Sequence, residues 1–190
     1  MFSAESALLA QIHEHGRGPV DVIIALDEVG RGCVAGPVLT CASLWVQSSK
    51  QQLWLSQVKD SKKLTPAKRL ACFQQVIKEF NYTEHSLPFK NSHLIPRVNL
   101  LKSKLVVQYL PDTLPIHSNS MQCIGFCLGE GSIAEVEQFN IWNAVQIAAS
   151  RALLGLKEFF LNEQNISLNR VVILMDGNKP LAVPEVFVDV

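Results

Sequence analysis

The apolar positions of the chain fall into four runs that predict buried strands. The runs lie at residues 22–26, 38–46, 121–128 and 170–175, and valine and isoleucine are frequent in them. Apolar runs of this length with many β-branched side chains are typical of strands that are covered on both faces. We therefore expect one sheet that is packed on each side.

Two further segments have apolar residues at helical spacing. The first begins at Thr65-Pro66, since threonine suits the N-cap and proline the first helical position. Its apolar stripe, which we expect to belong to the core, comprises Phe73, Val76, Ile77 and Phe80. The second begins with a capping-box pattern at 132–135 and runs through Leu153, with Gly155 expected near its end. The order of elements predicts an α/β fold, with a mixed sheet and helices on both faces.

The segment 81–120 is the least readable part of the chain. Its three histidines, at 85, 93 and 117, are too scattered for a metal site and suit surface or loop roles. The stretch from Asn99 to Leu110 predicts either a short helix or a strand.

Composition narrows the class of protein. The chain has 190 residues, of which 48% are hydrophobic, so it is long enough for one domain with a substantial core. The net charge is zero, so a nucleic-acid site would have to come from local clustering of basic residues. Five cysteines without a Cys-x-x-Cys pair favour a reducing compartment. The sequence shows no membrane span or signal pattern, and we expect a cytoplasmic protein.

Two of the predicted strands end in acidic residues. Asp27 and Glu28 follow the first strand, and Asp176 follows the last. Taken singly, such acids are more often solvated or part of a turn. If the two strands are neighbours, however, the three carboxylates converge at the sheet edge where ligands bind in open α/β folds. Their mutual repulsion would be relieved by a divalent cation, and hard oxygen ligands favour Mg²⁺ or Mn²⁺ over Zn²⁺.

Two basic segments are candidate nucleic-acid contacts. Gly30-Arg31-Gly32 is either a plain tight turn or a place where the backbone approaches a nucleic-acid strand, with Arg31 contacting a phosphate. Lys62 and Lys63 are either part of a solvated loop or phosphate contacts that position a duplex without reading its sequence.

Four blocks, in order along the chain, resemble ribonuclease HII (type 2 ribonuclease H). They are D-E-x-G-R-G-x-x-x-G-P at 27–37, D-S-K-K-L at 60–64, the helix-like segment 135–153 and I-L-M-D-G-N at 173–178. The resemblance implies that residues 1–190 form a single ribonuclease H-like catalytic domain, with Asp27, Glu28 and Asp176 as catalytic metal ligands. It also implies that the glycine-flanked Arg31 segment contacts the 2′-hydroxyl at an RNA–DNA junction.

The activity implied by this resemblance is that of an endonuclease. It would hydrolyse the RNA strand of RNA–DNA hybrids and cut at ribonucleotides embedded in duplex DNA, as in DNA replication and repair. Two Mg²⁺ or Mn²⁺ ions would activate the water and steady the leaving oxygen, giving a 3′-hydroxyl and a 5′-phosphate. We expect such a protein to act as a monomer.

The chain also departs from the family pattern. The family uses a fourth acid in a K-G-D or K-A-D segment, and its expected position falls past Val190, while Asp189 comes several residues too early. The last strand and helices of the family fold are also missing, and 81–120 reads as an insertion. The alternative is therefore a catalytically impaired, nucleic-acid-binding remnant of that enzyme. A nuclease of integrase or resolvase type is a further alternative, although such enzymes lack the G-R-G after D-E.

Overall fold

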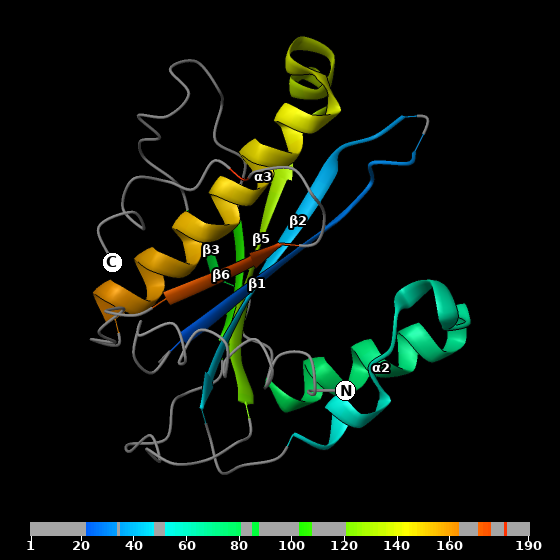
Figure 1. Cartoon of the computed structure of the whole chain (residues 1–190), viewed down its shortest axis with the longest axis vertical. Helices are drawn as coiled ribbons and strands as arrows, with labels where there is room; N and C mark the ends of the chain where they lie inside the picture. Colours follow the sequence, from blue (N-terminus) through cyan, green and yellow to red (C-terminus); the bar gives the residue numbers. More distant parts are fainter. Residues whose placement is uncertain are drawn as a thin grey trace, which may run out of the picture.

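A single mixed sheet organises the part of the chain that the structure describes. The computed structural model describes residues 22–33, 35–47, 52–80, 85–87, 103–107, 121–163, 171–175 and 181. In these ranges the strands follow the order β3-β4-β5-β2-β1-β6 (Figure 1). The strands are β1 (Val22–Val29), β2 (Val38–Gln47), β3 (His85–Leu87), β4 (Ser103–Val107), β5 (Met121–Gly131) and β6 (Val171–Met175). The helical elements are η1 (Leu53–Gln57), η2 (Ser61–Lys63), α2 (Pro66–Glu79) and α3 (Ile133–Glu163).

Strand pairing makes the sheet mixed. β1 pairs antiparallel with β2, β2 pairs antiparallel with β5, and β6 lies parallel to β1. β4 and β3 extend the sheet beyond β5, again antiparallel. Within the stretch from Asn99 to Leu110, for which the sequence allowed a helix or a strand, the described residues 103–107 form a strand.

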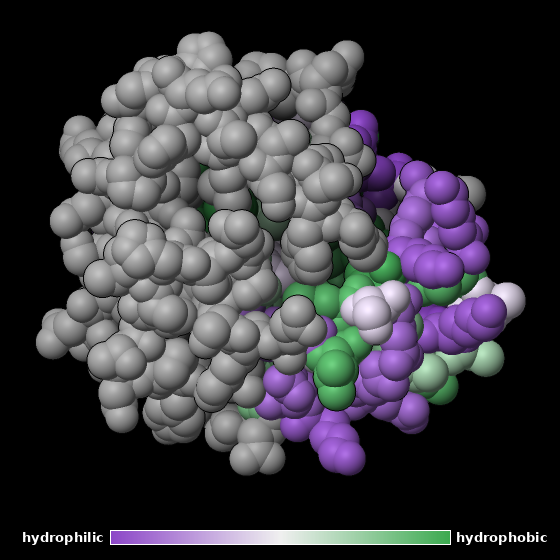
Figure 2. All heavy atoms as spheres, turned by 60° about the horizontal axis from the view of Figure 1, so that its bottom comes forward, coloured by the Kyte–Doolittle hydropathy of each residue, from purple (hydrophilic) through white to green (hydrophobic). Residues whose placement is uncertain are grey.

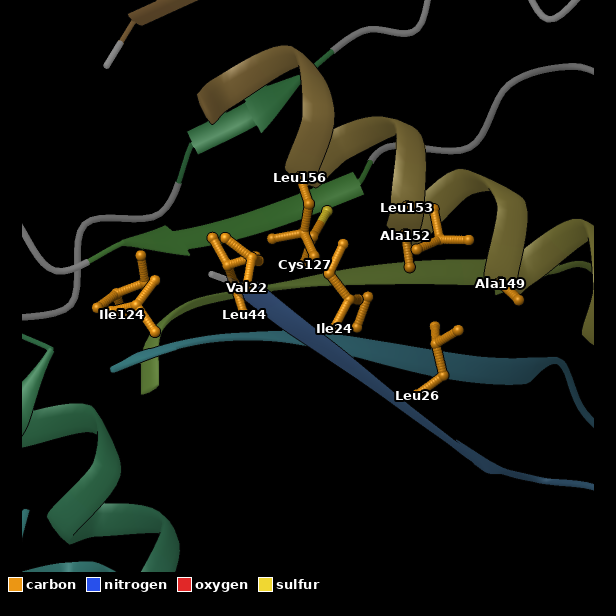
Figure 3. Packing of buried hydrophobic residues seen from close by; sticks show 12 residues of the cluster. Val22, Ile24, Leu26, Leu44, Ile124, Cys127, Ala149, Ala152, Leu153 and Leu156 are labelled. Carbon is orange, nitrogen blue, oxygen red and sulfur yellow. The ribbon is translucent and has the colours of Figure 1, made fainter. Parts of the chain in front are cut away.

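One face of the sheet is covered by α3. In Figure 3 the buried side chains of β1, β2 and β5 lie beneath this helix. The helix contributes Ala149, Ala152, Leu153 and Leu156, and the strands contribute Val22, Ile24, Leu26, Ala42, Leu44, Val46, Ile124 and Cys127. A second buried cluster, nearer the start of the helix, contains Val38, Ala144, Val145 and Ala148. This packing accounts for the apolar runs that predicted the strands.

The backbone of α3 lies unusually close to β5. A Cβ atom added to Gly129 would lie 2.0 Å from the carbonyl oxygen of Ala148, and one added to Gly131 would lie 2.6 Å from that of Ala144. Glycines on the strand and alanines on the helix therefore allow a contact that larger side chains would prevent.

The opposite face carries an aromatic cluster next to α2 and η1. Phe80 is only 1% exposed and packs with Cys123, together with Trp45, Trp54, Val76 and Phe126. The side-chain amide of Gln52 accepts from the backbone N–H of Cys123 at 2.8 Å and donates to its carbonyl oxygen at 2.9 Å. These two bonds join the segment before η1 to β5. Helical elements thus cover both faces, and the predicted α/β fold class is confirmed.

Two expectations about the helices were wrong. Phe73 was expected in the core but is 57% exposed, because α2 meets the aromatic cluster through Val76 and Phe80 near its C-terminal end. Apolar residues lie among polar ones on the surface shown in Figure 2. In addition, α3 does not end near Gly155 but continues to Glu163, with Leu153 and Leu156 buried against the sheet. Tertiary packing of one helix face outweighs the weak helix propensity of a single glycine.

No helix in the described ranges is both long enough and apolar enough to cross a lipid bilayer.

Candidate functional site

β1 continues through the two adjacent acids instead of ending before them. Its pairing with β2 runs on through Asp27 opposite Cys41 and Glu28 opposite Thr40. The expected strand end at residue 26 was therefore wrong, because antiparallel pairing holds the backbone extended as far as Val29. Successive side chains of a strand point to opposite faces. Asp27 and Glu28 consequently lie on different sides of the sheet.

Asp27 lies on the side of the sheet away from α3. It is exposed, and its Oδ1 accepts a hydrogen bond from the backbone N–H of Glu28 at 2.9 Å. Burial and the nearby Asp27 carboxylate raise the pKa of the Cys41 thiol to about 12. The Cys41 thiol therefore stays protonated and inert at neutral pH.

Glu28 lies on the side of the sheet that faces α3. Its side chain is only 13% exposed, and its Oε1 accepts a hydrogen bond from Nη1 of Arg31 at 2.8 Å. The guanidinium carbon of Arg31 lies 5.6 Å from the centre of the Trp142 ring on α3. Next to Glu28 in the register, Thr40 is fully buried, and its Oγ1 finds no hydrogen-bond partner in the described structure. Buried hydroxyls without a hydrogen-bond partner are uncommon in folded proteins.

The turn after β1 depends on glycine at one position. Gly30 has φ +105°, and a Cβ there would lie 2.6 Å from the carbonyl oxygen of Pro37. The turn is closed by a hydrogen bond from the Cys33 N–H to the Gly30 carbonyl at 3.3 Å. Gly32 differs, since a Cβ there would meet no atom within 4 Å and its φ is ordinary. The fold thus requires glycine at 30 but gives no internal reason for glycine at 32.

The parallel pairing of β1 with β6 brings the two predicted acidic strand ends to the same edge. Leu26 lies opposite Met175, and the next residues in sequence are Asp27 and Asp176. Asp176 itself lies outside the described residues, so the convergence of the three carboxylates stays a prediction. Within the ranges that are described, no three His, Cys, Asp or Glu side chains gather as a metal-binding group.

The two candidate lysines belong to a different element. Lys62 and Lys63 are exposed on η2, directly before α2. The loop is held by Asp60, which accepts from the Lys62 N–H at 2.9 Å, and by Arg69, whose Nη1 donates to the carbonyl oxygens of Ser61 and Leu64. The lysine side chains therefore project from a loop whose shape is fixed by other residues.

Asn140 and Asn143, near the start of α3, both make side-chain hydrogen bonds to the backbone. Asn140 has φ +70° and interrupts α3, and its Oδ1 accepts from the N–H groups of Trp142 and Asn143 at 3.0 and 3.1 Å. Nδ2 of Asn143 donates to the carbonyl oxygen of Phe139 at 2.9 Å. Asn140 thus caps the second, longer segment of α3.

A buried ion pair was missed at the sequence level. Arg151 donates to Glu135 through both ends of its guanidinium, at 2.8 and 2.9 Å, and also to the carbonyl oxygen of Glu130. The predicted capping box is also present, since Glu135 accepts from the Ser132 N–H at 2.8 Å. The capping pattern marked Glu135, but nothing in the sequence pointed to a partner 16 residues away.

Comparison with known proteins supports the resemblance. The family model for ribonuclease HII matches residues 24–109, which include the acidic pair, the glycine-flanked arginine and the two lysines. A ribonuclease HII from Ehrlichia canis is 26% identical over 158 residues, covering 83% of this chain and 49% of the relative. One from Trichormus variabilis is 25% identical over 160 residues, covering 84% and 48%.

The predicted resemblance to ribonuclease HII is confirmed by these matches. A shorter match, to ribonuclease HII from Lactobacillus acidophilus, reaches 35% identity over 82 residues, covering 43% of this chain and 30% of the relative. The chain spans about half the length of the longer-matching ribonuclease HII relatives. The family match reaches residue 109 and so enters the segment 81–120, but it stops well before Asp176.

Proposed function

We propose that this chain carries out the ribonuclease H reaction, hydrolysing the RNA strand of RNA–DNA hybrids and cutting at ribonucleotides embedded in duplex DNA. The observation that carries the proposal is the parallel pairing of β1 with β6. Leu26 and Met175 lie opposite each other, and the next residue in sequence is an acid on each chain segment, Asp27 after Leu26 and Asp176 after Met175, toward the same edge of the sheet. In open α/β sheets this is the edge at which ligands bind.

The donor chemistry at this edge fits a hard divalent cation. Asp27 is exposed and accepts a hydrogen bond through Oδ1, while Glu28 is already paired with Arg31. We propose that Asp27, Glu28 and Asp176 hold Mg²⁺ or Mn²⁺, and that two such ions occupy the complete site. Bound there, the ions would supply activation of a water and stabilisation of the leaving oxygen. Asp27 is one residue past Leu26 as Asp176 is one residue past Met175, and we propose that these two acids share a metal ion.

The turn beside this edge suits a nucleic-acid strand. Gly30 is required by its own backbone, whereas Gly32 is exposed and has open space where a side chain would be. A glycine that the fold does not need allows an outside backbone or ribose to approach closely. We propose that residues 30–32 meet the ribonucleotide, and that Lys62 and Lys63 contact phosphates of the same duplex.

The test is cleavage of a labelled DNA duplex that contains one ribonucleotide, and of an RNA–DNA hybrid, with Mg²⁺ or Mn²⁺. We expect Asp27→Asn to lower the rate at least about a hundredfold, since loss of a metal ligand removes several kcal/mol of transition-state stabilisation. The matched control is Glu79→Gln, which neutralises an exposed carboxylate on α2, away from the proposed site, and should keep the wild-type rate.

A second candidate function is binding of hybrid without cutting it, and the observation that favours it is the ion pair that Glu28 already makes with Arg31. A protein of this kind would bind hybrid equally well with and without Mg²⁺ and would show no cleavage. Cleavage that Asp27→Asn does not reduce would refute the proposed site.

A further inference from the structure

Arg31 is held from two sides in the turn that follows β1. Its Nη1 donates to Oε1 of Glu28 at 2.8 Å, and its guanidinium carbon lies 5.6 Å from the centre of the Trp142 ring. The distance is within the range in which a cation is attracted to the face of an indole. The side chain is still 45% exposed, so the guanidinium is oriented without being buried.

The Trp142 ring, against which the Arg31 guanidinium lies, is held in place through both its backbone and its side chain. Its N–H donates to Oδ1 of Asn140 at 3.0 Å, which sets the first turn of the longer segment of α3. Its ring packs against the buried cluster that contains Val38, Ala144 and Val145. The ring therefore joins α3 to the turn at residues 30–33, although more than a hundred residues separate the two in sequence.

The remaining hydrogen-bonding capacity of Arg31 suits a phosphate. A guanidinium has several N–H donors in a planar fork, and its contact with Glu28 uses Nη1. An exposed arginine side chain would otherwise sample many rotamers, and ordering it on binding costs free energy. Stacking on a fixed ring lowers that cost before the nucleic acid arrives.

We propose that Trp142 is a positioning residue, which holds the guanidinium of Arg31 ready for a backbone phosphate of the bound nucleic acid. This inference rests on the proposed function and deepens it, since it adds a residue on α3 to the nucleic-acid interface. Trp142 itself acts through Arg31.

The experiment measures binding of the 190-residue chain to a short fluorescein-labelled RNA–DNA hybrid by anisotropy, in EDTA so that no cleavage occurs. The variants are Trp142→Leu, Trp142→Phe, Arg31→Ala and the double variant Arg31→Ala with Trp142→Leu, each at several KCl concentrations. We expect Trp142→Leu to raise Kd about three- to fivefold, while Trp142→Phe, which keeps a ring face, stays within about twofold of the wild type.

Salt dependence separates positioning from a merely structural role. We expect Arg31→Ala and Trp142→Leu each to reduce the slope of log Kd against log salt by about one, because one phosphate contact is lost. In the Arg31→Ala background, Trp142→Leu should add nothing further. A general loss of folding would lower the melting temperature and the binding, but would leave the slope unchanged.

The outcomes are distinguishable. A wild-type chain that neither binds nor cuts hybrid removes the proposed function, and the phosphate role of Arg31 with it. If the wild type binds hybrid, either of two results overturns the positioning role alone. One is a salt slope that Trp142→Leu leaves unchanged, and the other is a Trp142→Leu effect on Kd that is as large in the Arg31→Ala background as in the wild type. Since Arg31 is exposed, Arg31→Ala leaves the core intact, and an unchanged slope in this variant alone also overturns the proposal.

Discussion

Removing one partner of the Glu135–Arg151 pair is the perturbation whose outcome the structure predicts most sharply. The two side chains are only 6% and 5% exposed, and they share two hydrogen bonds of 2.8 and 2.9 Å. Glu135 also accepts from the backbone N–H and hydroxyl of Ser132, and Arg151 donates to the carbonyl oxygen of Glu130. The pair thus ties the end of β5 and the short first segment of α3 to the middle of that helix.

The magnitude follows from what the remaining partner loses. In Glu135→Gln the guanidinium of Arg151 stays buried without a counter-charge, which costs about 3–5 kcal/mol. That is a large share of the ~5–15 kcal/mol by which native domains are stable. For a chain of this length it corresponds to a fall in Tm of roughly 6–20 °C. Replacing both partners, as in Glu135→Leu with Arg151→Met, removes the unpaired charge and should be far less destabilising than either single change.

The pair also predicts a pH dependence. Burial by itself would raise the pKa of the Glu135 carboxyl, but hydrogen bonds from Arg151 and Ser132 outweigh it, so the pKa lies below the ordinary glutamate value. A lowered folded-state pKa stabilises the fold above the unfolded pKa of about 4.3, and this contribution is lost as the pH falls through the folded value. The stability difference between wild type and Glu135→Gln should therefore be constant near neutral pH and shrink in acid.

Urea unfolding followed by circular dichroism measures both effects. Glu137→Gln is the matched control, because Glu137 lies two residues further along the same helix segment but is exposed. Two results would show that the pair does not hold α3 in the way described. In the first, Glu135→Gln is as stable as Glu137→Gln; in the second, the double replacement lowers the free energy of unfolding by as much as the two single changes added together.

Two further predictions test the packing of the sheet. Gly129→Ala should lower the free energy of unfolding in urea by about 1–3 kcal/mol or more, since its Cβ would meet the backbone of Ala148 at 2.0 Å. Gly32→Ala, which has open space around it, should leave stability unchanged. Equal stability of the two variants would contradict the close contact of α3 with β5. Iodoacetamide at about pH 8 should label the exposed Cys33 well before Cys41, because the pKa of the Cys41 thiol is raised to about 12. Early labelling of Cys41 in mass spectra would contradict its protected position.

The sequence could predict the features that depend on local pattern. Apolar runs located four of the six strands found in the described residues, and the threonine–proline and capping-box signals located the starts of α2 and α3. Each of these signals acts over a few residues, either through burial of a strand or through bonds to the first turn of a helix. The motif around Asp27 was also readable, because it is contiguous in sequence.

Other features needed the tertiary structure because they join residues that are far apart. The ion pair of Glu135 with Arg151, the stacking of Arg31 on Trp142 and the glycine–alanine contact between β5 and α3 leave no periodic signal. The break of α3 at Asn140 could not be predicted either, since an asparagine with a positive φ leaves no signal in the hydrophobic pattern.

By itself, the sequence determined that this chain has an α/β fold and an acidic, glycine-rich segment that follows the apolar run of its first strand. These features depend on burial and turn formation, which residues close in sequence decide. Only the tertiary structure decided that β1 extends through both acids and sends Asp27 and Glu28 to opposite faces. It likewise decided that β6 lies parallel to β1, and that Arg31 rests on a helix from the other half of the chain. Strand length and strand partners are set by pairing and packing between distant segments, and these follow from the fold as a whole.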